Sequence, residues 1–255
     1  MITFGTDEHE RSLAAFWDAY VDAGRPGARY AVRHRRAVRD AVRAVRGLPA
    51  LDAAPTDAPG GRAVRRVLDA RVSYGVPARL LGTAVLEVPA DPEDYTTGRR
   101  AQTLRRKIRA AEGRGLKPRP VEDPAERRAL VAAADRAERT HADASYRVPD
   151  PDNDDLLQHD VWLTVDGPDG QPLLLAVAPR DGAFATLRYF RTLGWSDAHS
   201  DARYLATAAL VTELSRLGVR YLIDTATPPE QTNGLRAFQR MVGFRYARIR
   251  LRRRA

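Results

Sequence analysis

The stretch LGVRYLIDTATPPEQTNGLRAFQRMVGFR, residues 217–245, decides the fold class. A glycine ends one helix, an apolar run predicts a buried strand at 219–225, and a polar loop leads into a short amphipathic helix that a second glycine closes. A strand that is mostly apolar, as this one is apart from Arg220 and its polar end, is typical of the centre of a sheet with helices on both faces. The stretch therefore predicts an α/β protein with a central strand at 219–225.

Upstream and downstream of this stretch, the second half of the chain reads β-α-β-β-β-α-β-α-β. The expected elements are strands at 116–123, 161–165, 173–178, 183–190, 219–225 and 244–252, and helices at 124–143, 201–217 and 233–244. The turns DGPDG and RDG predict hairpins between the three middle strands. This order favours a mixed sheet, because a doubly wound fold alternates strand and helix throughout.

The first half reads as mostly helical. Helices are expected at 8–23, 29–46 and 97–112, a mobile Pro/Ala/Gly loop at 48–62, and one strand at 80–88. The sequence thus predicts two parts: residues 1–115 with basic helices, and residues 116–255 with the sheet.

Composition restricts the classes of function. The chain has 255 residues, no cysteine and a net charge of +9. The lack of cysteine excludes disulfides, thiolate metal sites and a Cys nucleophile, and the positive charge favours an anionic partner. The scattered His and Asp residues have no metal-ligand spacing, so no metal is expected. The sequence contains no run near the roughly 20 apolar residues that cross a bilayer, and its N-terminus is acidic, so a cytoplasmic protein without a membrane span is expected.

The second half resembles the GNAT (N-acetyltransferase-like) fold, and within that superfamily the chain is most similar to the Fem-type enzymes. The matching positions are Tyr221, Asp224, Gly234, Leu235, Phe238, Gly243 and Phe244. A second block, TAVLEVPADPEDY at 83–95 with LRRKIRAAEGRGL at 104–116, resembles the acidic turn and basic helix of the same enzymes. Tyr221 and Asp224 are three positions apart, whereas the family's pair is adjacent.

The resemblance implies a GNAT-like fold whose N-terminal GNAT-like half is truncated and mostly helical. It also implies transfer of an amino acid from aminoacyl-tRNA to an amine, with tRNA and a small-molecule or peptide amine as partners and no further cofactor. The protein's tasks would be positioning, removal of a proton from the amine and stabilisation of the oxyanion by a strand N–H.

One departure from the superfamily bears on the acyl donor. GNAT enzymes that use acyl-CoA carry Q/R-x-x-G-x-G/A before the long helix, where backbone N–H groups hold the pyrophosphate. The corresponding stretch here, RTLGWSDAHSDARYL at 191–205, has one glycine and the acids Asp197 and Asp201. Transfer from acyl-CoA or acyl-carrier protein stays as the alternative function, and a non-catalytic RNA-binding protein on a GNAT scaffold as a second alternative.

Three residues are candidates for catalysis. Asp224 ends an apolar strand, where a carboxylate is costly unless it is paired, so it either caps a loop or serves the substrate amine. His199 has the pKa that suits a general base, and Tyr246 is a candidate acid for the leaving group. Candidate substrate-binding residues are Arg188, Tyr189, Trp195, Tyr204, Thr225 and Asn233.

Two dense groups of basic residues are candidates for tRNA binding. They are Arg35, Arg39 and Arg43 in the second helix, and Arg99, Arg100, Arg105, Arg106, Lys107 and Arg109 at the third. The guanidinium fork suits phosphate, but an Arg-rich helix face can equally be a solvated surface.

Overall fold

The computed structural model describes residues 7–24, 27–72, 75–99 and 101–252. The first part of the chain contains α1 (Asp7–Asp22), α2 (Ala28–Arg33), α3 (Arg35–Gly47), β1 (Ala50–Ala53), α4 (Pro59–Asp69), the 3₁₀ turn η2 (Ala78–Leu80), β2 (Thr83–Glu87), the turn η3 (Pro92–Thr96) and α5 (Gln102–Gly113). The second part contains β3 (Lys117–Pro120), α6 (Pro124–Arg139), the turns η4 (Ala144–Tyr146) and η5 (Asp154–Gln158), β4 (Trp162–Asp166), β5 (Pro172–Val177), β6 (Arg180–Asp181), β7 (Phe184–Thr186), β8 (Tyr189–Thr192), α7 (Asp197–Arg216), β9 (Tyr221–Ile223), α8 (Asn233–Met241) and β10 (Arg245–Leu251).

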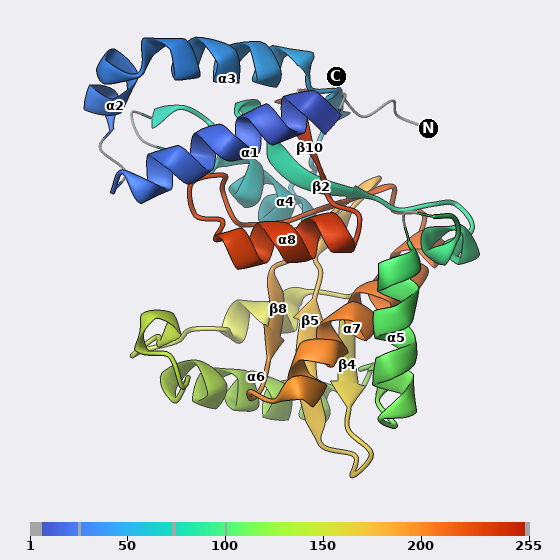
Figure 1. Ribbon diagram of the computed structural model, residues 1–255. Helices are drawn as coiled ribbons and strands as arrows, with labels where there is room; N and C mark the ends of the chain where they lie inside the picture. The colour runs from blue at the N-terminus through green and yellow to red at the C-terminus, as the bar shows by residue number, and fades with distance from the viewer. Residues whose placement is uncertain (1–6, 25–26, 73–74, 100, 253–255) are drawn as a thin grey trace.

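The strands form two sheets, which lie one above the other in Figure 1. The upper sheet has the strand order β1-β10-β2-β9-β7-β6, and the lower one has the order β3-β4-β5-β8. In the upper sheet β9 runs parallel to β7 and antiparallel to β2, whereas the lower sheet is an antiparallel meander. The fold is therefore mixed α/β, and β9 is a central strand, as the sequence predicts.

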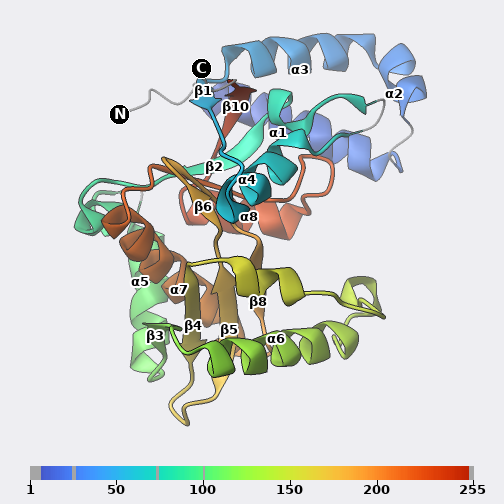
Figure 2. The same ribbon diagram turned by 180° about the vertical axis from the view of Figure 1, so that it is seen from behind.

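Helices cover both faces of each sheet (Figure 2). In the lower sheet, α6 packs through Leu130, Val131 and Ala134 on one face, and α7 packs on the other. In the upper sheet, α4 contributes Val64 and Leu68 to one face. The opposite face packs against α1, α7 and α8.

Capping side chains fix where the helices begin. Asp123 accepts hydrogen bonds from two backbone N–H groups at the start of α6, and Ser196 and Thr232 do the same once each for α7 and α8. Pro124 occupies the first position of α6, where its missing N–H costs nothing. Because Ser196 caps it, α7 begins at Asp197, earlier than the expected start at residue 201.

Three other expectations about the elements are wrong. The helix expected at 29–46 is broken at His34, whose ring stacks on Tyr30 at a centroid distance of 4.2 Å. The loop expected at 48–62 contains β1 and the start of α4, because β1 pairs in parallel with β10 at the other end of the chain. The strand expected at 183–190 is two strands, because the chain leaves the upper sheet after Leu187 and enters the lower one.

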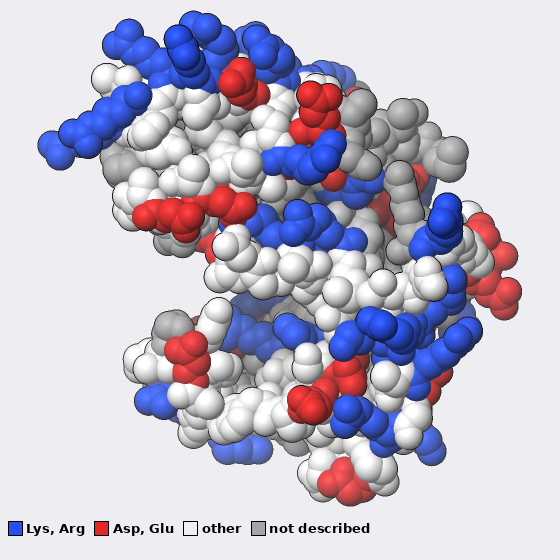
Figure 3. All heavy atoms as spheres, in the orientation of Figure 1, with Lys and Arg blue, Asp and Glu red and all other residues white. Residues whose placement is uncertain are grey.

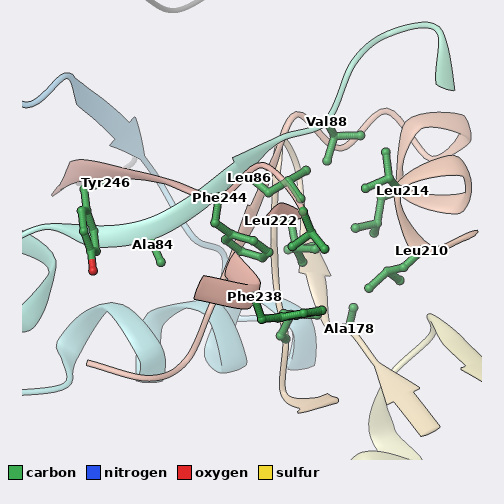
Figure 4. Packing of buried hydrophobic residues seen from close by; sticks show 14 of the residues in the cluster. Ala84, Leu86, Val88, Ala178, Leu210, Leu214, Leu222, Phe238, Phe244 and Tyr246 are labelled. Atoms are coloured by element: carbon green, nitrogen blue, oxygen red, sulfur yellow. The ribbon is translucent and has the colours of Figure 1, made fainter. Parts of the chain in front are cut away.

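The division into parts at residue 115 stays a prediction. Strands β1 and β2 come from the first part, yet both pair with β10, and β2 also pairs with β9. Figure 4 shows the apolar cluster that results, with Ala84 and Leu86 of β2 beside Phe244 and Leu222. Tyr246 stands at one end of this cluster, and its hydroxyl points away from the apolar side chains (Figure 4).

Candidate active site

The two sheets separate between β8 and β9, and Asp224 lies at that point. Leu187 N donates to Ile223 O at 2.9 Å, and beyond this bond β8 pairs with β5 of the lower sheet. Asp224 N instead donates to Ala84 O at 3.0 Å, so the chain after β9 stays beside β2. The carboxylate that the sequence places at the end of the central strand thus lies where the sheet splits.

The Asp224 carboxylate is held by two donors. Its Oδ1 accepts from Ala226 N at 2.8 Å, and its Oδ2 accepts from Gln239 Nε2 of α8 at 2.9 Å. Burial raises the pKa of Asp224, and both hydrogen bonds oppose that rise because they stabilise the charged form. Thr225, the next residue, is half-buried.

A second hydrogen-bonded chain holds Tyr246 on β10. Its hydroxyl donates to Gln231 Oε1 at 2.7 Å, and Gln231 Nε2 donates to Ala226 O at 3.3 Å. Burial raises the pKa of Tyr246 to about 12, and the nearby Arg236 and Arg240 act against that rise. Asp224 and Tyr246 are therefore brought into one polar network through the loop between β9 and α8.

A cavity of about 1250 Å³ opens beside this network. Tyr246, Gln239, Arg236 and Arg240 line it on the side of β10 and α8. The other walls come from α1, β2, η3, the start of α5 and the turn after α7. Asp224 is not among the lining residues, so its carboxylate lies one hydrogen bond behind the wall that Gln239 forms.

His199 lies outside this network. It belongs to the first turn of α7, where its Nδ1 is 2.8 Å from Ser196 Oγ. Its ring lies over Gly194, since a Cβ at that glycine would be 2.6 Å from His199 Nε2. Burial lowers the pKa of His199. No described contact of His199 is with Asp224 or Tyr246, so its catalytic role stays a prediction.

The candidate substrate-binding residues do not gather in one pocket. Arg188 makes a bidentate ion pair with Asp155, at 2.8 and 2.7 Å. Tyr189 is buried in the cluster between the lower sheet and α6, and this burial raises its pKa. Tyr204 is buried beside Phe238, and Trp195 is 57% exposed.

Asn233 is the exception among these candidates. It is the first residue of α8, and its Oδ1 accepts from Arg236 Nη2 at 3.1 Å. It therefore touches a residue that lines the cavity, although its own side chain is exposed.

The basic residues form two separate surfaces. Figure 3 shows Lys and Arg gathered along the top, over α3, and again at the lower right, over α5. The first surface contains the exposed Arg35, Arg39 and Arg43, of which Arg43 is paired with Asp40 at 3.2 Å. Both ribbon views place α3 and α5 in different parts of the molecule, so the two groups do not make one continuous face (Figures 1 and 2).

Two basic side chains of α5 are engaged within the protein. Arg105 donates to the backbone oxygens of Thr96 and Gly98, at 2.6 and 2.8 Å. Lys107 is 3.6 Å from Asp201 and lies over the ring of Tyr204. The side chains that remain exposed at this surface are Arg99, Arg106 and Arg109, and Arg100 lies outside the described residues.

Of the two acids that the sequence places in the stretch 191–205, only Asp197 faces solvent in the structure. Asp201 is buried and paired with Lys107 and with Arg114, whose Nε is 3.1 Å away. Its charge is therefore compensated by α5 and does not face the loop. The exposed Asp197 remains in the first turn of α7, where a pyrophosphate would approach.

Sequence reasoning missed Gln231, Arg236 and Gln239. Arg236 and Gln239 are buried on α8 next to Phe238, at 5% and 3% exposure. Their spacing of three places them on one helical face. Polar residues that share a helix's buried side are the signal that could have identified them.

No protein-family model matches the sequence, and no curated protein matches it. Two solved structures are similar to this chain: a C-terminal domain (DUF2156) attributed to a lysylphosphatidylglycerol synthetase of Agrobacterium fabrum, and L-PGS from Bacillus licheniformis. The first is 16% identical with a TM-score of 0.47, over 65% of this chain and 58% of that chain. The second is 11% identical with a TM-score of 0.47, over 65% and 57%.

The chain thus spans less than two thirds of either structure. At this level of similarity the comparison adds nothing to what the strand order already shows. Among the described residues, no helix is long and apolar enough to cross a membrane, and no cluster of His, Asp and Glu could hold a metal ion.

Proposed function

We propose that the protein is an acyltransferase that moves the aminoacyl group of an aminoacyl-tRNA onto an amine acceptor. The observation that carries this proposal is the pair of polar side chains, Tyr246 and Gln239, that line the cavity and are each fixed in orientation from behind. Polar groups whose orientation is fixed suit the positioning of two substrates in such a cavity.

The direction of the Gln239 amide follows from Asp224. An ionised carboxylate can only accept hydrogen bonds, so it holds the Gln239 NH₂ group toward itself. The Gln239 oxygen is then directed away from Asp224 and can accept an N–H of the acceptor amine. In this account Asp224 is a positioning residue, and Gln239 contacts the substrate.

In this account the Tyr246 O–H turns from Gln231 Oε1 toward the ester and supplies the proton that the leaving group needs. Its pKa of about 12 keeps the phenol protonated at neutral pH. The neutral amine attacks the ester carbonyl, the bond between the carbonyl carbon and the ribose oxygen breaks, and Tyr246 protonates that oxygen. The amine proton then restores Tyr246, so the products are an amide and free tRNA. The positive charge of Arg236 and Arg240 favours the neutral form of the amine.

Two observations support tRNA as the carrier of the acyl group. The exposed arginines of α3 and α5 offer phosphate contacts. The α7 N-terminus, where acyl-CoA would place its pyrophosphate, carries Asp197 and has only Gly194 in place of a glycine-rich loop. The ester of aminoacyl-tRNA is already activated, so the reaction needs no ATP.

The test is incubation with mixed tRNA charged with labelled amino acids and a panel of amines. We expect RNase-sensitive transfer that Tyr246→Phe abolishes and that Tyr146→Phe, a change at an exposed tyrosine outside the cavity, leaves intact. Turnover of acyl-CoA without transfer from any charged tRNA would overturn the proposal in favour of an acyl-CoA enzyme. Salt-sensitive RNA binding without transfer from either donor would identify a non-catalytic RNA-binding protein.

A further inference from the structure

One end of the cavity gathers arginines from three elements. Arg11 of α1, Arg236 and Arg240 of α8 and Arg245 of β10 line it, together with the acid Glu10. Arg245 Nε donates to both oxygens of Glu10, at 2.8 and 2.7 Å, so these two charges compensate each other. Arg236 is likewise paired with Asp18 of α1, so Arg240 is an exposed positive charge beside these two ion pairs.

Arg236 is incompletely satisfied in this position. Its side chain is 5% exposed, and its Nη2 is bonded to Asp18 and to Asn233 Oδ1. Its Nη1 is buried and has no hydrogen-bond partner among the described residues. A guanidinium presents five donors in a rigid fork, and a buried donor without an acceptor is costly. An acceptor from outside the chain would remove that cost.

Arg240 adds a second positive charge next to Arg236. It lies four residues after Arg236, so the two like charges are neighbours on one face of α8 and repel each other. Unlike Arg236, Arg240 is exposed. An anion that contacts both side chains would relieve the repulsion, and it would satisfy Nη1 once the Arg236 side chain turns that buried atom toward the cavity.

We propose that this end of the cavity binds an anionic group, a phosphate or a carboxylate, through Arg236 and Arg240. Because Tyr246 and Gln239 line the same cavity, the anion belongs to the acceptor: the amine that receives the acyl group also bears a negative charge. The identification of the ligand as the acceptor rests on the proposed function, whereas the anion site itself does not.

Calorimetric titration of the full chain tests the site without using the reaction. The probes are O-phosphoethanolamine, β-alanine and propylamine, which share an amine and differ in the phosphate, the carboxylate or the absence of both. We expect the two anionic amines to bind. Propylamine should bind at least about tenfold more weakly, because it lacks a charge-assisted hydrogen bond of that size. Equal affinity for all three probes overturns the proposal.

Variants assign the binding to the named residues. Arg240→Ala changes an exposed side chain, and Arg236→Lys keeps the charge of a buried one while losing the fork. We expect each to weaken O-phosphoethanolamine binding about tenfold, with circular dichroism and the Tm confirming that both variants fold. Arg39→Ala, on the separate surface of α3, is the matched control. Unchanged affinity in the first two variants, or an equal loss in the control, contradicts the site.

Two further arms identify the source of the anion. Inorganic phosphate that binds as tightly as O-phosphoethanolamine would contradict the role of the amine. Vesicles of phosphatidylcholine, with and without phosphatidic acid, test a lipid headgroup, and retention that requires Arg236 and Arg240 supports a lipid-borne anion. Aminoacyl transfer without anion binding refutes the site alone, and anion binding without transfer refutes the proposed function alone.

Discussion

Replacement of Asp224 by asparagine tests whether this carboxylate sets the direction of the Gln239 amide. In the wild type, Asp224 accepts from Ala226 N at 2.8 Å and from Gln239 Nε2 at 2.9 Å. In Asp224→Asn the Ala226 N–H retains the one remaining oxygen, so the new NH₂ group faces Gln239. Two NH₂ groups cannot bond each other, and the Gln239 amide turns over. Its own NH₂ group then faces the cavity in place of its oxygen.

The reversed amide presents a donor to an amine that needs an acceptor. Loss of a hydrogen bond to a charged or reacting group costs about 1.5–3 kcal/mol, which corresponds to roughly 10- to 150-fold in kcat/KM for the acceptor. The assay is labelled transfer at varied acceptor concentration. Gln239→Leu should lose a similar factor, and the double variant should add little to either. A kcat/KM for Asp224→Asn within twofold of the wild type would refute the reasoning.

The Asp224→Asn variant can also be compared with the wild type by the pH dependence of the free energy of unfolding. Burial raises the pKa of Asp224 above its ordinary 3.8, so the folded state binds this proton more readily than the unfolded chain. The free energy of unfolding of the wild type should therefore rise, relative to Asp224→Asn, as pH falls from the raised pKa toward 3.8. Urea unfolding at neutral and acidic pH measures this difference, and a difference that is constant with pH would contradict the burial of the charge.

Three more outcomes are expected. Tyr246→Phe should lower kcat by about 100-fold or more with little change in the acceptor KM, because a general acid contributes about that factor; an unchanged kcat removes Tyr246 from the mechanism. Gly60→Ala should lower the free energy of unfolding by about 1–3 kcal/mol, because the new Cβ would lie 2.0 Å from a backbone oxygen of β6. Gly113→Ala is the control, because its Cβ would meet no atom within 4 Å, and it should not destabilise the protein. Arg106→Glu with Arg109→Glu should weaken tRNA retention on filters without lowering the Tm, and equal retention would mean that this side of α5 is only a solvated surface.

The sequence predicts the second half of the fold well because its elements are locally encoded. The all-apolar β9, the capped helices and the tight turns each follow from short-range patterns, and Asp224 stands at the strand end that the pattern indicates. The break at Leu187 could not be predicted, because it depends on which sheet each neighbouring residue pairs with. The same holds for β1, which pairs with β10 at the far end of the chain.

Part of the candidate site can be predicted from the sequence, and the rest depends on how distant elements pack together. Asp224 stands out as a carboxylate at the end of an apolar strand, and the structure joins it with Tyr246 of β10 in one network. Arg236 and Gln239 lie on a short polar helix, where burial is decided by what α1 and β10 place against them. Sequence reasoning also groups Lys107 with the exposed arginines, although its partner Asp201 lies on α7.

The order in which the upper sheet acquires its strands bears on how the chain folds during synthesis. Val85 of β2 pairs with Ile223 of β9, and Ala50 of β1 pairs with Arg248 of β10. At ribosomal rates of about 5–20 residues per second, β2 waits roughly 7–28 s for its first neighbour. Throughout that interval its backbone edges can pair with other nascent chains. Both edges of β2 are covered only once β9 and β10 have been synthesised, so a chain that ends before residue 245 leaves one edge of β2 without its partner.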